Sequence, residues 1–292
     1  MPLFPSSTIQ SVSNQPLQAG TYLEMMRIFP MFPQRVFLQW VLRNPTLGIT
    51  YEFTVDRSGS AEGPWETITT PPIYDFYYVD MAFPSNTVTG TPDLMSMTRS
   101  VYYRITAQPS AGGDTVSIIK KIEPWLDRRR EGIHRKLVRD AMISLKRVIG
   151  TEIAALKKKK WGTKCTLCLS SMGISVNPYC PQCYGTTFQG GYWTPVYGWA
   201  QLFTTPISIQ TALQGESERK QTRLLMAHIP QMDKEDLIVF LRTNKYFQVD
   251  EVTPTQIHNV DVHQELIVSE LSPTSAEYDL KVDPWREPCW WV

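Results

Sequence analysis

Residues 165–192, CTLCLSSMGISVNPYCPQCYGTTFQGGY, contain four of the five cysteines in the chain and decide how its middle part folds. These cysteines follow the pattern Cys-x2-Cys-x11-Cys-x2-Cys and are Cys165, Cys168, Cys180 and Cys183. Each Cys-x2-Cys turn can aim two sulfurs at one point, and two such turns that face each other complete a four-sulfur cage. The spacing therefore predicts a structural metal site with these four cysteines as ligands.

Zinc is the metal that the pattern favours, because four thiolates suit Zn²⁺ and a site with four protein ligands leaves no position open for chemistry. An iron–sulfur centre is the alternative. A thioredoxin-type redox pair would need a Cys-x2-Cys at the start of a helix in a βαβ unit, which the surrounding sequence does not predict. Two disulfides would need an oxidising compartment. The fifth cysteine, Cys289, is expected to be a packed or free thiol.

The composition predicts a folded protein of the cytoplasm. The chain has 292 residues, of which 42% are hydrophobic and 20% charged, so it can bury the cores of two or three domains. It has no apolar run long enough to cross a membrane, and its first residues lack the basic and apolar regions of a secretory signal. The net charge of +1 predicts no strong overall attraction to nucleic acid or anionic lipid.

The N-terminal part of the chain divides into an arm and a β domain. Residues 1–33 are rich in Ser, Pro and Gln, and they are predicted to form an extended arm that orders against a partner. Residues 34–124 alternate apolar and polar side chains, as at Tyr51, Phe53 and Val55, with turn residues between most of the runs. This pattern predicts short antiparallel strands.

The order of three features in residues 34–124 resembles immunoglobulin and fibronectin type III domains. Trp40 comes early, YEFTVDRSGSAEGPWETI follows at 51–68, and YYRITA comes late, at 102–107. The resemblance implies a β-sandwich of about 90 residues. The segment has no cysteine, so no disulfide can join the two sheets.

Residues 125–160 are predicted to form one long helix, because apolar residues recur every three or four positions over most of that range. Arg128, Arg129 and Arg130 lie near its positive end, where solvated arginines are expected and an external acidic partner is the alternative. Four lysines end the predicted helix, namely Lys157, Lys158, Lys159 and Lys160. They are expected to be solvated and to complement the negative helix terminus, and non-specific contact with DNA in a channel is the alternative.

The remaining sequence predicts a fold that is mainly β, with one long helix. Residues 161–195 hold the predicted zinc ribbon, and residues 196–284 are predicted to form a small antiparallel β-barrel, since strand-like runs alternate with turn residues. Residues 285–292 are a Trp-rich tail without a core of its own. Its tryptophans, Trp285, Trp290 and Trp291, either bury against a neighbouring subunit or fold back onto the same one.

The sequence contains none of the common catalytic or nucleotide-binding motifs. It has no Walker A loop, no Rossmann glycine motif, no HExxH zinc motif and no GxSxG nucleophile motif. Asp233, Glu235 and Asp236 cluster at a turn before a strand, where solvated acids are common. We therefore expect a structural or binding protein with no catalytic residues and no small-molecule substrate, although an enzyme remains the third hypothesis.

Two stretches resemble proteins of tailed-bacteriophage virions. The stretch 161–200, WGTKCTLC…CPQCYGTTFQGGYWTPVYGWA, is similar to a zinc-ribbon segment of such virion proteins. The stretch 235–280, from EDLIVFLRTNKYFQVDEV to SPTSAEYDL, resembles the small β-barrel of phage neck proteins. Neck proteins of the simplest kind carry neither the sandwich nor the zinc segment.

The resemblance implies a structural virion protein that forms a homo-oligomeric ring where the head joins the tail, around a DNA channel. Its implied partners are the portal or an adaptor protein and the tail terminator or tube proteins, with assembly in the host cytoplasm and no membrane contact. A zinc-ribbon nucleic-acid-binding protein is the alternative from another class, and a tail or baseplate component is the alternative within the virion.

Overall fold

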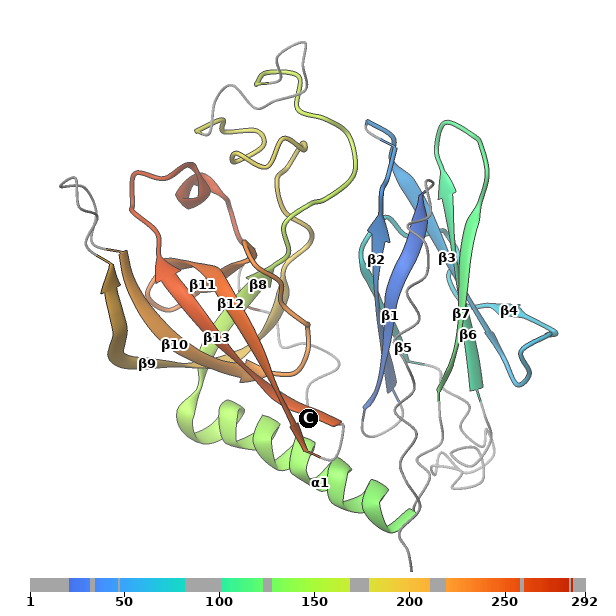
Figure 1. Cartoon of the computed structure of the whole chain (residues 1–292), viewed down its shortest axis with the longest axis horizontal. Helices are drawn as coiled ribbons and strands as arrows, with labels where there is room; N and C mark the ends of the chain where they lie inside the picture. Colours follow the sequence, from blue (N-terminus) through green and yellow to red (C-terminus); the bar gives the residue numbers. More distant parts are fainter. Residues whose placement is uncertain are drawn as a thin grey trace, which may run out of the picture.

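The computed structural model describes residues 21–31, 35–46, 48–81, 101–122, 128–168, 179–210, 219–257, 260–283 and 285 (Figure 1). Most of the predicted N-terminal arm and C-terminal tail lies outside these residues, including Cys289, Trp290 and Trp291. The chain is mainly β, as the sequence predicted. No helix within the described ranges is both long and apolar enough to cross a membrane.

The first part of the chain forms a module of two antiparallel sheets, which we call the two-sheet module. One sheet has the order β1-β2-β5 and the other the order β4-β3-β6-β7. The strands of the first sheet are β1 (Tyr22–Met31), β2 (Arg35–Arg43) and β5 (Tyr77–Asp80). Those of the second are β3 (Tyr51–Ser58), β4 (Glu66–Thr67), β6 (Val101–Pro109) and β7 (Val116–Ile122).

The two sheets pack face to face through side chains that alternate along their strands. Tyr51, Phe53 and Val55 are all buried, which confirms the predicted inner face of β3. The ring centroids of Trp40 in β2 and Phe53 in β3 lie 5.3 Å apart, so these rings join the sheets at the centre of the core. The predicted extended arm of residues 1–33 is wrong at its end, because β1 pairs with β2.

The helix is shorter than predicted. It comprises α1 (Arg128–Ser144) and a π-helical turn, η2 (Leu145–Ile149), and it ends where the amide of Gly150 donates to the carbonyl of Leu145 at 2.9 Å. A Cβ atom on Gly150 would lie 2.3 Å from that oxygen, so only glycine fits this turn. Residues 151–156, predicted to be helical, form a strand instead.

The second module is a closed antiparallel barrel of six strands in the order β10-β13-β12-β11-β8-β9. Its strands are β8 (Thr151–Leu156), β9 (Val196–Gln210), β10 (Arg219–Ala227), β11 (Leu237–Phe240), β12 (Lys245–Ile257) and β13 (Val260–Glu270). A short 3-10 helix, η3 (Ala276–Asp279), follows. The predicted barrel is confirmed, but it begins at residue 151 rather than 196.

Because the barrel begins at β8, the cysteine segment is an insertion between two barrel strands and not a separate ribbon before the barrel. Strands β8 and β9 pair directly, with Thr151 opposite Ala200 and Ala155 opposite Val196. Beyond the barrel rim, isolated bridges join Lys158 to Tyr192 and Lys164 to Phe188. The cysteines therefore lie on an elaborated β8–β9 hairpin that projects from the barrel, and we call residues 157–195 the cysteine hairpin.

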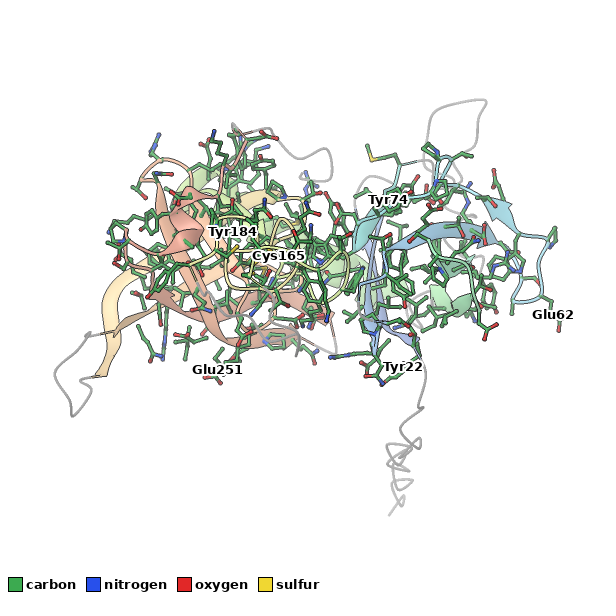
Figure 2. The ribbon with its side chains drawn as sticks, turned by 90° about the horizontal axis from the view of Figure 1, so that it is seen from above. Tyr22, Glu62, Tyr74, Cys165, Tyr184 and Glu251 are labelled. Atoms are coloured by element: carbon green, nitrogen blue, oxygen red, sulfur yellow. The ribbon has the colours of Figure 1, made fainter. Side chains whose placement is uncertain are left out.

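The two modules lie side by side, and α1 runs along the lower edge of the molecule in Figure 1. In Figure 2, Cys165 and Tyr184 lie on the barrel side, whereas Tyr22, Tyr74 and Glu62 belong to the two-sheet module. One cluster of buried apolar residues runs from the two-sheet module through the inner face of α1 to the outside of the barrel. The cysteine hairpin thus projects from the barrel beside the junction of the modules.

Candidate metal centre

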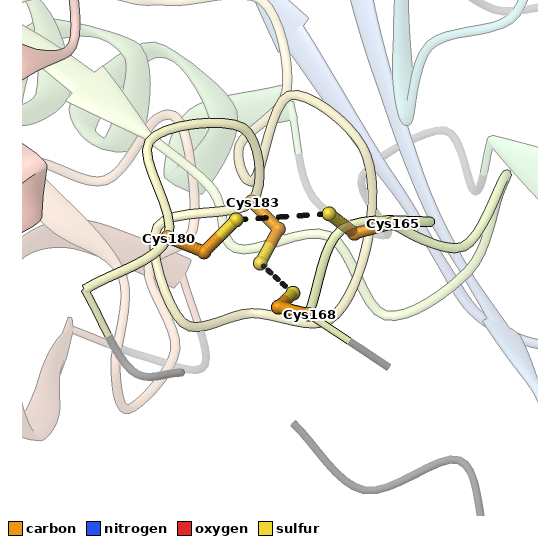
Figure 3. Close-up of side chains that lie close together, drawn as sticks. All are labelled: Cys165, Cys168, Cys180 and Cys183. Atoms are coloured by element: carbon orange, nitrogen blue, oxygen red, sulfur yellow. Dashed lines mark hydrogen bonds between the residues drawn. The ribbon is translucent and has the colours of Figure 1, made fainter. Parts of the chain in front are cut away.

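The four predicted ligands come together in the cysteine hairpin (Figure 3). All four side chains are buried, and their sulfur atoms all lie within 4.8 Å of one another. The Sγ atoms of Cys165 and Cys180 are 3.7 Å apart, and those of Cys168 and Cys183 are 3.0 Å apart. None of the four is in a disulfide. Sulfurs bound tetrahedrally to one ion at ~2.3 Å would be about 3.8 Å apart, a separation within the range found here, so the cluster could hold a metal ion.

The turn that carries Cys180 and Cys183 is closed by backbone hydrogen bonds. The amide of Tyr184 donates to the carbonyl of Cys180 at 2.8 Å, and the amide of Thr186 donates to the carbonyl of Cys183 at 2.8 Å. Backbone N–H groups of Gln182 and Cys183 donate to the Cys180 sulfur and lower the pKa of its thiol to about 7. Burial has the opposite effect on Cys183 in the same turn and raises the pKa of its thiol.

Hydrogen bonds also tie the two cysteine turns to each other. The amide of Cys165 donates to the carbonyl of Thr187, and the amide of Gln189 donates to the carbonyl of Thr163, both at 2.9 Å. Gly191 closes the hairpin with φ +65°, and a Cβ atom there would lie 2.9 Å from the carbonyl oxygen of Cys183. The local backbone therefore sets the position of the four sulfurs.

Two tryptophans connect the base of the cysteine hairpin to the two-sheet module. Trp161 and Trp193 have ring centroids 4.9 Å apart. Trp161 also meets Phe53 edge-on at 6.3 Å, and Trp193 lies 6.4 Å from Phe76. Since Phe53 and Phe76 belong to the core of the two-sheet module, the hairpin is packed between the modules.

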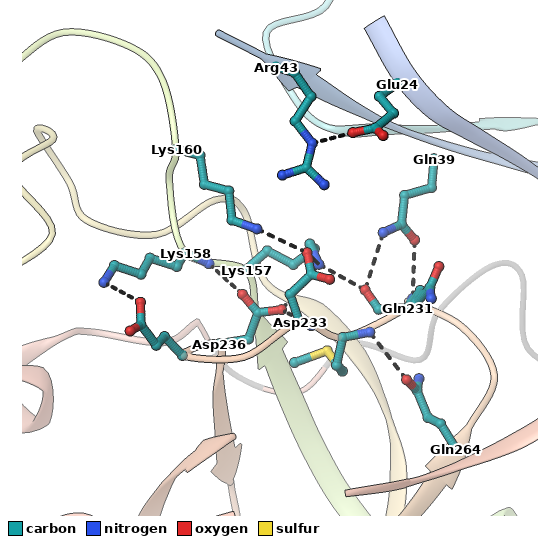
Figure 4. Close-up of polar contacts among 12 residues, drawn as sticks. Glu24, Gln39, Arg43, Lys157, Lys158, Lys160, Gln231, Asp233, Asp236 and Gln264 are labelled. Atoms are coloured by element: carbon teal, nitrogen blue, oxygen red, sulfur yellow. Dashed lines mark hydrogen bonds and ion pairs between the residues drawn. The ribbon is translucent and has the colours of Figure 1, made fainter. Parts of the chain in front are cut away.

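The lysine run lies on this hairpin and not at a helix end, so the predicted helix-terminus role is wrong. Lys157 is buried, and its Nζ donates to the Gln231 carbonyl at 2.8 Å and to the carboxylates of Asp233 and Asp236, each at 3.1 Å (Figure 4). Burial lowers the pKa of Lys157, but the nearby carboxylates outweigh this effect and raise the pKa above its ordinary value. Burial at this depth also excludes Lys157 as a contact for DNA.

Asp236 is completely buried beside Lys157. Burial favours its neutral acid and raises its pKa, whereas N–H donors favour the carboxylate. Amides of Asp233 and Lys158 donate to its two oxygens at 2.6 and 2.9 Å, and Lys157 adds a third donor. Because both oxygens accept N–H bonds, we treat Lys157 and Asp236 as a buried ion pair.

The other three lysines of the run also have partners on their own chain. Lys158 pairs with Glu235 at 2.9 Å, and Lys160 pairs with Asp233 at 3.2 Å. Lys159 donates to the Gln189 carbonyl at 2.8 Å, and its ammonium lies over the ring of Trp193. DNA contact by Lys158, Lys159 and Lys160 stays a prediction. Each of these lysines already has a partner within the chain.

Gln39 makes a direct polar link between the modules. Its side-chain amide donates to the carbonyl of Gln231 at 3.2 Å, and its oxygen accepts from the amide of Gln231 at 3.1 Å. Gln39 lies on β2 and is buried, whereas Gln231 precedes the turn that holds Asp233 and Asp236. The barrel turn at residues 231–236 therefore forms hydrogen bonds both with the lysine run and with the two-sheet module.

Trp285 is the one tail tryptophan among the described residues. Its ring meets Tyr197 edge-on at 5.7 Å and Trp199 at 4.7 Å, so it packs against β9 of its own chain. This contact is the folded-back arrangement that the sequence allowed for Trp285. An oligomer contact through Trp285 stays a prediction, while Trp290 and Trp291 lie outside the described residues.

Sequence reasoning missed the acids and amides that surround Lys157. From the sequence, Asp233, Glu235 and Asp236 are expected to be solvated. In the structure Asp236 is fully buried, and the other two acids, Glu235 and Asp233, pair with lysines. The signal was the opposite charge of two short runs, KKKK at 157–160 and DKED at 233–236. Comparisons with protein-family models, with curated proteins and with solved structures gave no match to this chain.

Proposed function

We propose that this protein is a structural component of a tailed-phage virion that forms a ring at the neck, where the portal joins the tail around a DNA channel. The observation that carries the proposal is the closed barrel, in which residues 235–280 form the strands β11, β12 and β13. This is the stretch whose sequence resembles the barrel of neck proteins. Portal or adaptor proteins and tail terminator or tube proteins are the proposed neighbours.

The two-sheet module is proposed to be a fibronectin type III-like sandwich that decorates the neck. Within the described part of this module, seven antiparallel strands divided three and four between two sheets support this assignment. Tyr103 of β6 adds a second argument, since its buried hydroxyl donates to the carboxylate of Asp80 at the end of β5 at 2.7 Å. A tyrosine that ties one strand back to an upstream residue is a recurrent feature of such sandwiches.

The metal is proposed to be a structural Zn²⁺ that stiffens the cysteine hairpin. Among the described residues the cluster consists of four buried sulfurs, and such soft donors support zinc over harder cations. When bound, the ion would supply folding energy to a segment too small to bury a core of its own. Because this hairpin is packed between the modules through Trp161 and Trp193, the ion would help to hold their relative orientation.

A mechanical role explains why polar and aromatic contacts concentrate at the junction of the modules. A ring subunit that joins a head to a tail must keep its shape under load, so a fixed angle between modules is useful. The Gln39–Gln231 hydrogen bonds and the aromatic contacts of Trp161 cross the junction, and the Lys157–Asp236 ion pair fixes the barrel rim beside it. These contacts support a building role.

Mass photometry and cryo-electron microscopy test the proposal. We expect particles whose mass is an integer multiple of 33.5 kDa and whose averaged images show a ring with a central channel. Maps of purified virions should place this chain between portal and tail. A chain that stays monomeric at micromolar concentration and is missing from virions would contradict the proposal, and density in the baseplate would favour the tail alternative.

A further inference from the structure

Positive charge is concentrated on the helix α1 and its final turn η2. Residues 128–149 contain eight basic and two acidic side chains, a net charge of +6, whereas the whole chain has +1. The remainder of the chain therefore carries a net charge of −5. The basic residues are Arg128, Arg129, Arg130, Arg135, Lys136, Arg139, Lys146 and Arg147. This uneven distribution gives α1 and η2 a positive electrostatic potential, although the net charge of the whole chain is small.

The inner face of α1 is already occupied by the protein. Met142 and Leu145 are buried, and Val138 packs against the same core as Trp199 of the barrel. Lys146 belongs to this side as well, with its ammonium over the ring of Trp199 at 5.3 Å from the centroid. What α1 offers to a partner is therefore its outer side.

The outer side of α1 is basic over the part whose side chains are described. Lys136, Arg139 and Arg147 are exposed, and their spacing of three and eight residues places them on one side of the helix. Asp140 is the one acidic side chain in the same stretch and is also exposed. Figure 1 shows α1 along the lower edge of the molecule.

The chemistry of this face favours nucleic acid over a lipid bilayer. A helix that lies in a membrane surface needs a broad exposed apolar face. Met142 and Leu145 are buried against the core, and the exposed apolar residues described here, Val148 and Ile149, are confined to the final turn η2. A row of cations suits the phosphate backbone of double-stranded DNA, because binding releases the counterions condensed on the duplex.

We propose that α1 binds the phosphate backbone of double-stranded DNA without reading its sequence. The proposal deepens the neck function and rests on it for its biological meaning, since a ring around a channel would contact the genome. The contact that it assigns lies on the helix, apart from the lysine run at the base of the cysteine hairpin.

Fluorescence anisotropy with a labelled duplex of about 30 base pairs tests the proposal on the purified full chain, between about 50 and 200 mM salt. The test variant is K136Q/R139Q/R147Q. The control is R43Q/R242Q/K245Q, which removes the same charge from three exposed residues on other elements. We expect the test variant to lose at least about tenfold in affinity at low salt and about 2–3 units of salt slope, and the control to bind like the wild type.

Three results would overturn the proposal: no binding of the wild type at low salt, equal losses in both triple variants, or binding to phosphatidylserine vesicles with none to DNA. Should the triple variant fail to fold by circular dichroism, R147Q alone is expected to lower the salt slope by about 1. Mass photometry of the same samples separates the two proposals. Rings without DNA binding refute only the role of α1, whereas DNA binding by a monomer refutes only the ring.

Discussion

The Nζ atom of Lys157 lies 3.1 Å from Oδ2 of Asp236, and both side chains are buried. Lys157 directly follows β8, and Asp236 directly precedes β11, the strand that pairs with β8. The pair therefore closes the rim of the barrel at the base of the cysteine hairpin. The carboxylate of Asp233 and the carbonyl of Gln231 complete the shell around the ammonium.

Replacing Lys157 by methionine is expected to lower the free energy of unfolding by about 3–5 kcal/mol, because it leaves Asp236 buried without its cation. Urea unfolding followed by tryptophan fluorescence measures the change. The control is K160M, which breaks an ion pair whose side chains are about 40% exposed and should cost less than about 1 kcal/mol. A K157M protein within about 1 kcal/mol of the wild type would show that the pair contributes little.

His228 is expected to make stability depend on pH near neutrality. Burial lowers the pKa of His228 from 6.5 to about 4 in the folded protein. As the pH falls below about 6.5 the unfolded chain gains a proton that the folded chain does not, so stability falls with pH. Between pH 8 and pH 5 this one group should remove about 2 kcal/mol.

The H228Q variant tests this assignment. Its free energy of unfolding should vary less between pH 8 and pH 5 than that of the wild type, by about 2 kcal/mol. Denaturant titrations at several pH values give both curves, and the range stops at pH 5 because carboxylates dominate below it. Parallel curves for the two proteins would assign the pH dependence to other groups.

Two adjacent glycines form a matched pair for testing the hairpin geometry. Both have positive φ, +78° at Gly190 and +65° at Gly191. A Cβ atom on Gly190 would meet only the flexible tip of Lys159, whereas one on Gly191 would lie 2.8 Å from the ring of Tyr184 and 2.9 Å from the Cys183 carbonyl.

G191A should therefore destabilise the protein by about 1–3 kcal/mol more than G190A, because it adds a backbone clash to the same conformational strain. It should also weaken metal retention during dialysis against a chelator, since the clash lies at a ligand residue. Thermal unfolding and metal analysis of both variants provide the measurement. Equal behaviour of the two would mean that the hairpin relaxes without disturbing the cysteines.

Removing one ligand should remove the metal and part of the stability together. C183S is expected to purify without a stoichiometric metal ion and to unfold at lower denaturant concentration, because metal binding contributes folding energy. L167S is the control, since Leu167 lies between two ligands but is 67% exposed. It should keep the metal and change stability by no more than about 0.5 kcal/mol. Full metal content in C183S would argue against a four-sulfur site.

The cysteine cluster could be predicted because its geometry is local. A Cys-x2-Cys turn places two sulfurs together whatever the rest of the fold does, so the spacing alone indicated four ligands at one point. The alternation at Tyr51, Phe53 and Val55 was equally reliable, because a strand with one buried face shows it directly.

The end of the helix could not be predicted from local preferences. Ile153, Ala154, Ala155 and Leu156 suit a helix, yet all four are buried in β8 between β9 and β11. A strand buried on both faces shows a continuous apolar run, which periodicity cannot distinguish from the inside of a helix. The barrel partners that decide the matter lie more than forty residues further along the chain, at Val196 and Leu237 onward.

The role of the lysine run also depended on a distant partner. Four consecutive lysines read as a solvated segment, and no local feature distinguishes Lys157 from Lys160. In the fold, Lys157 reaches the buried Asp236, seventy-nine positions away, while Lys160 stays half-exposed. Burial of a charge is set by which segments pair, so it appears only when the barrel is closed.

The most direct test of the central claim is X-ray absorption spectroscopy of the purified chain at the zinc edge, combined with elemental analysis. Four cysteines that hold one structural ion predict about one zinc per chain, with four sulfur neighbours at about 2.3 Å and no nitrogen or oxygen in the first shell. A chain without a bound metal, a shell with fewer than four sulfurs, or cysteines joined as disulfides in the intact protein would contradict it.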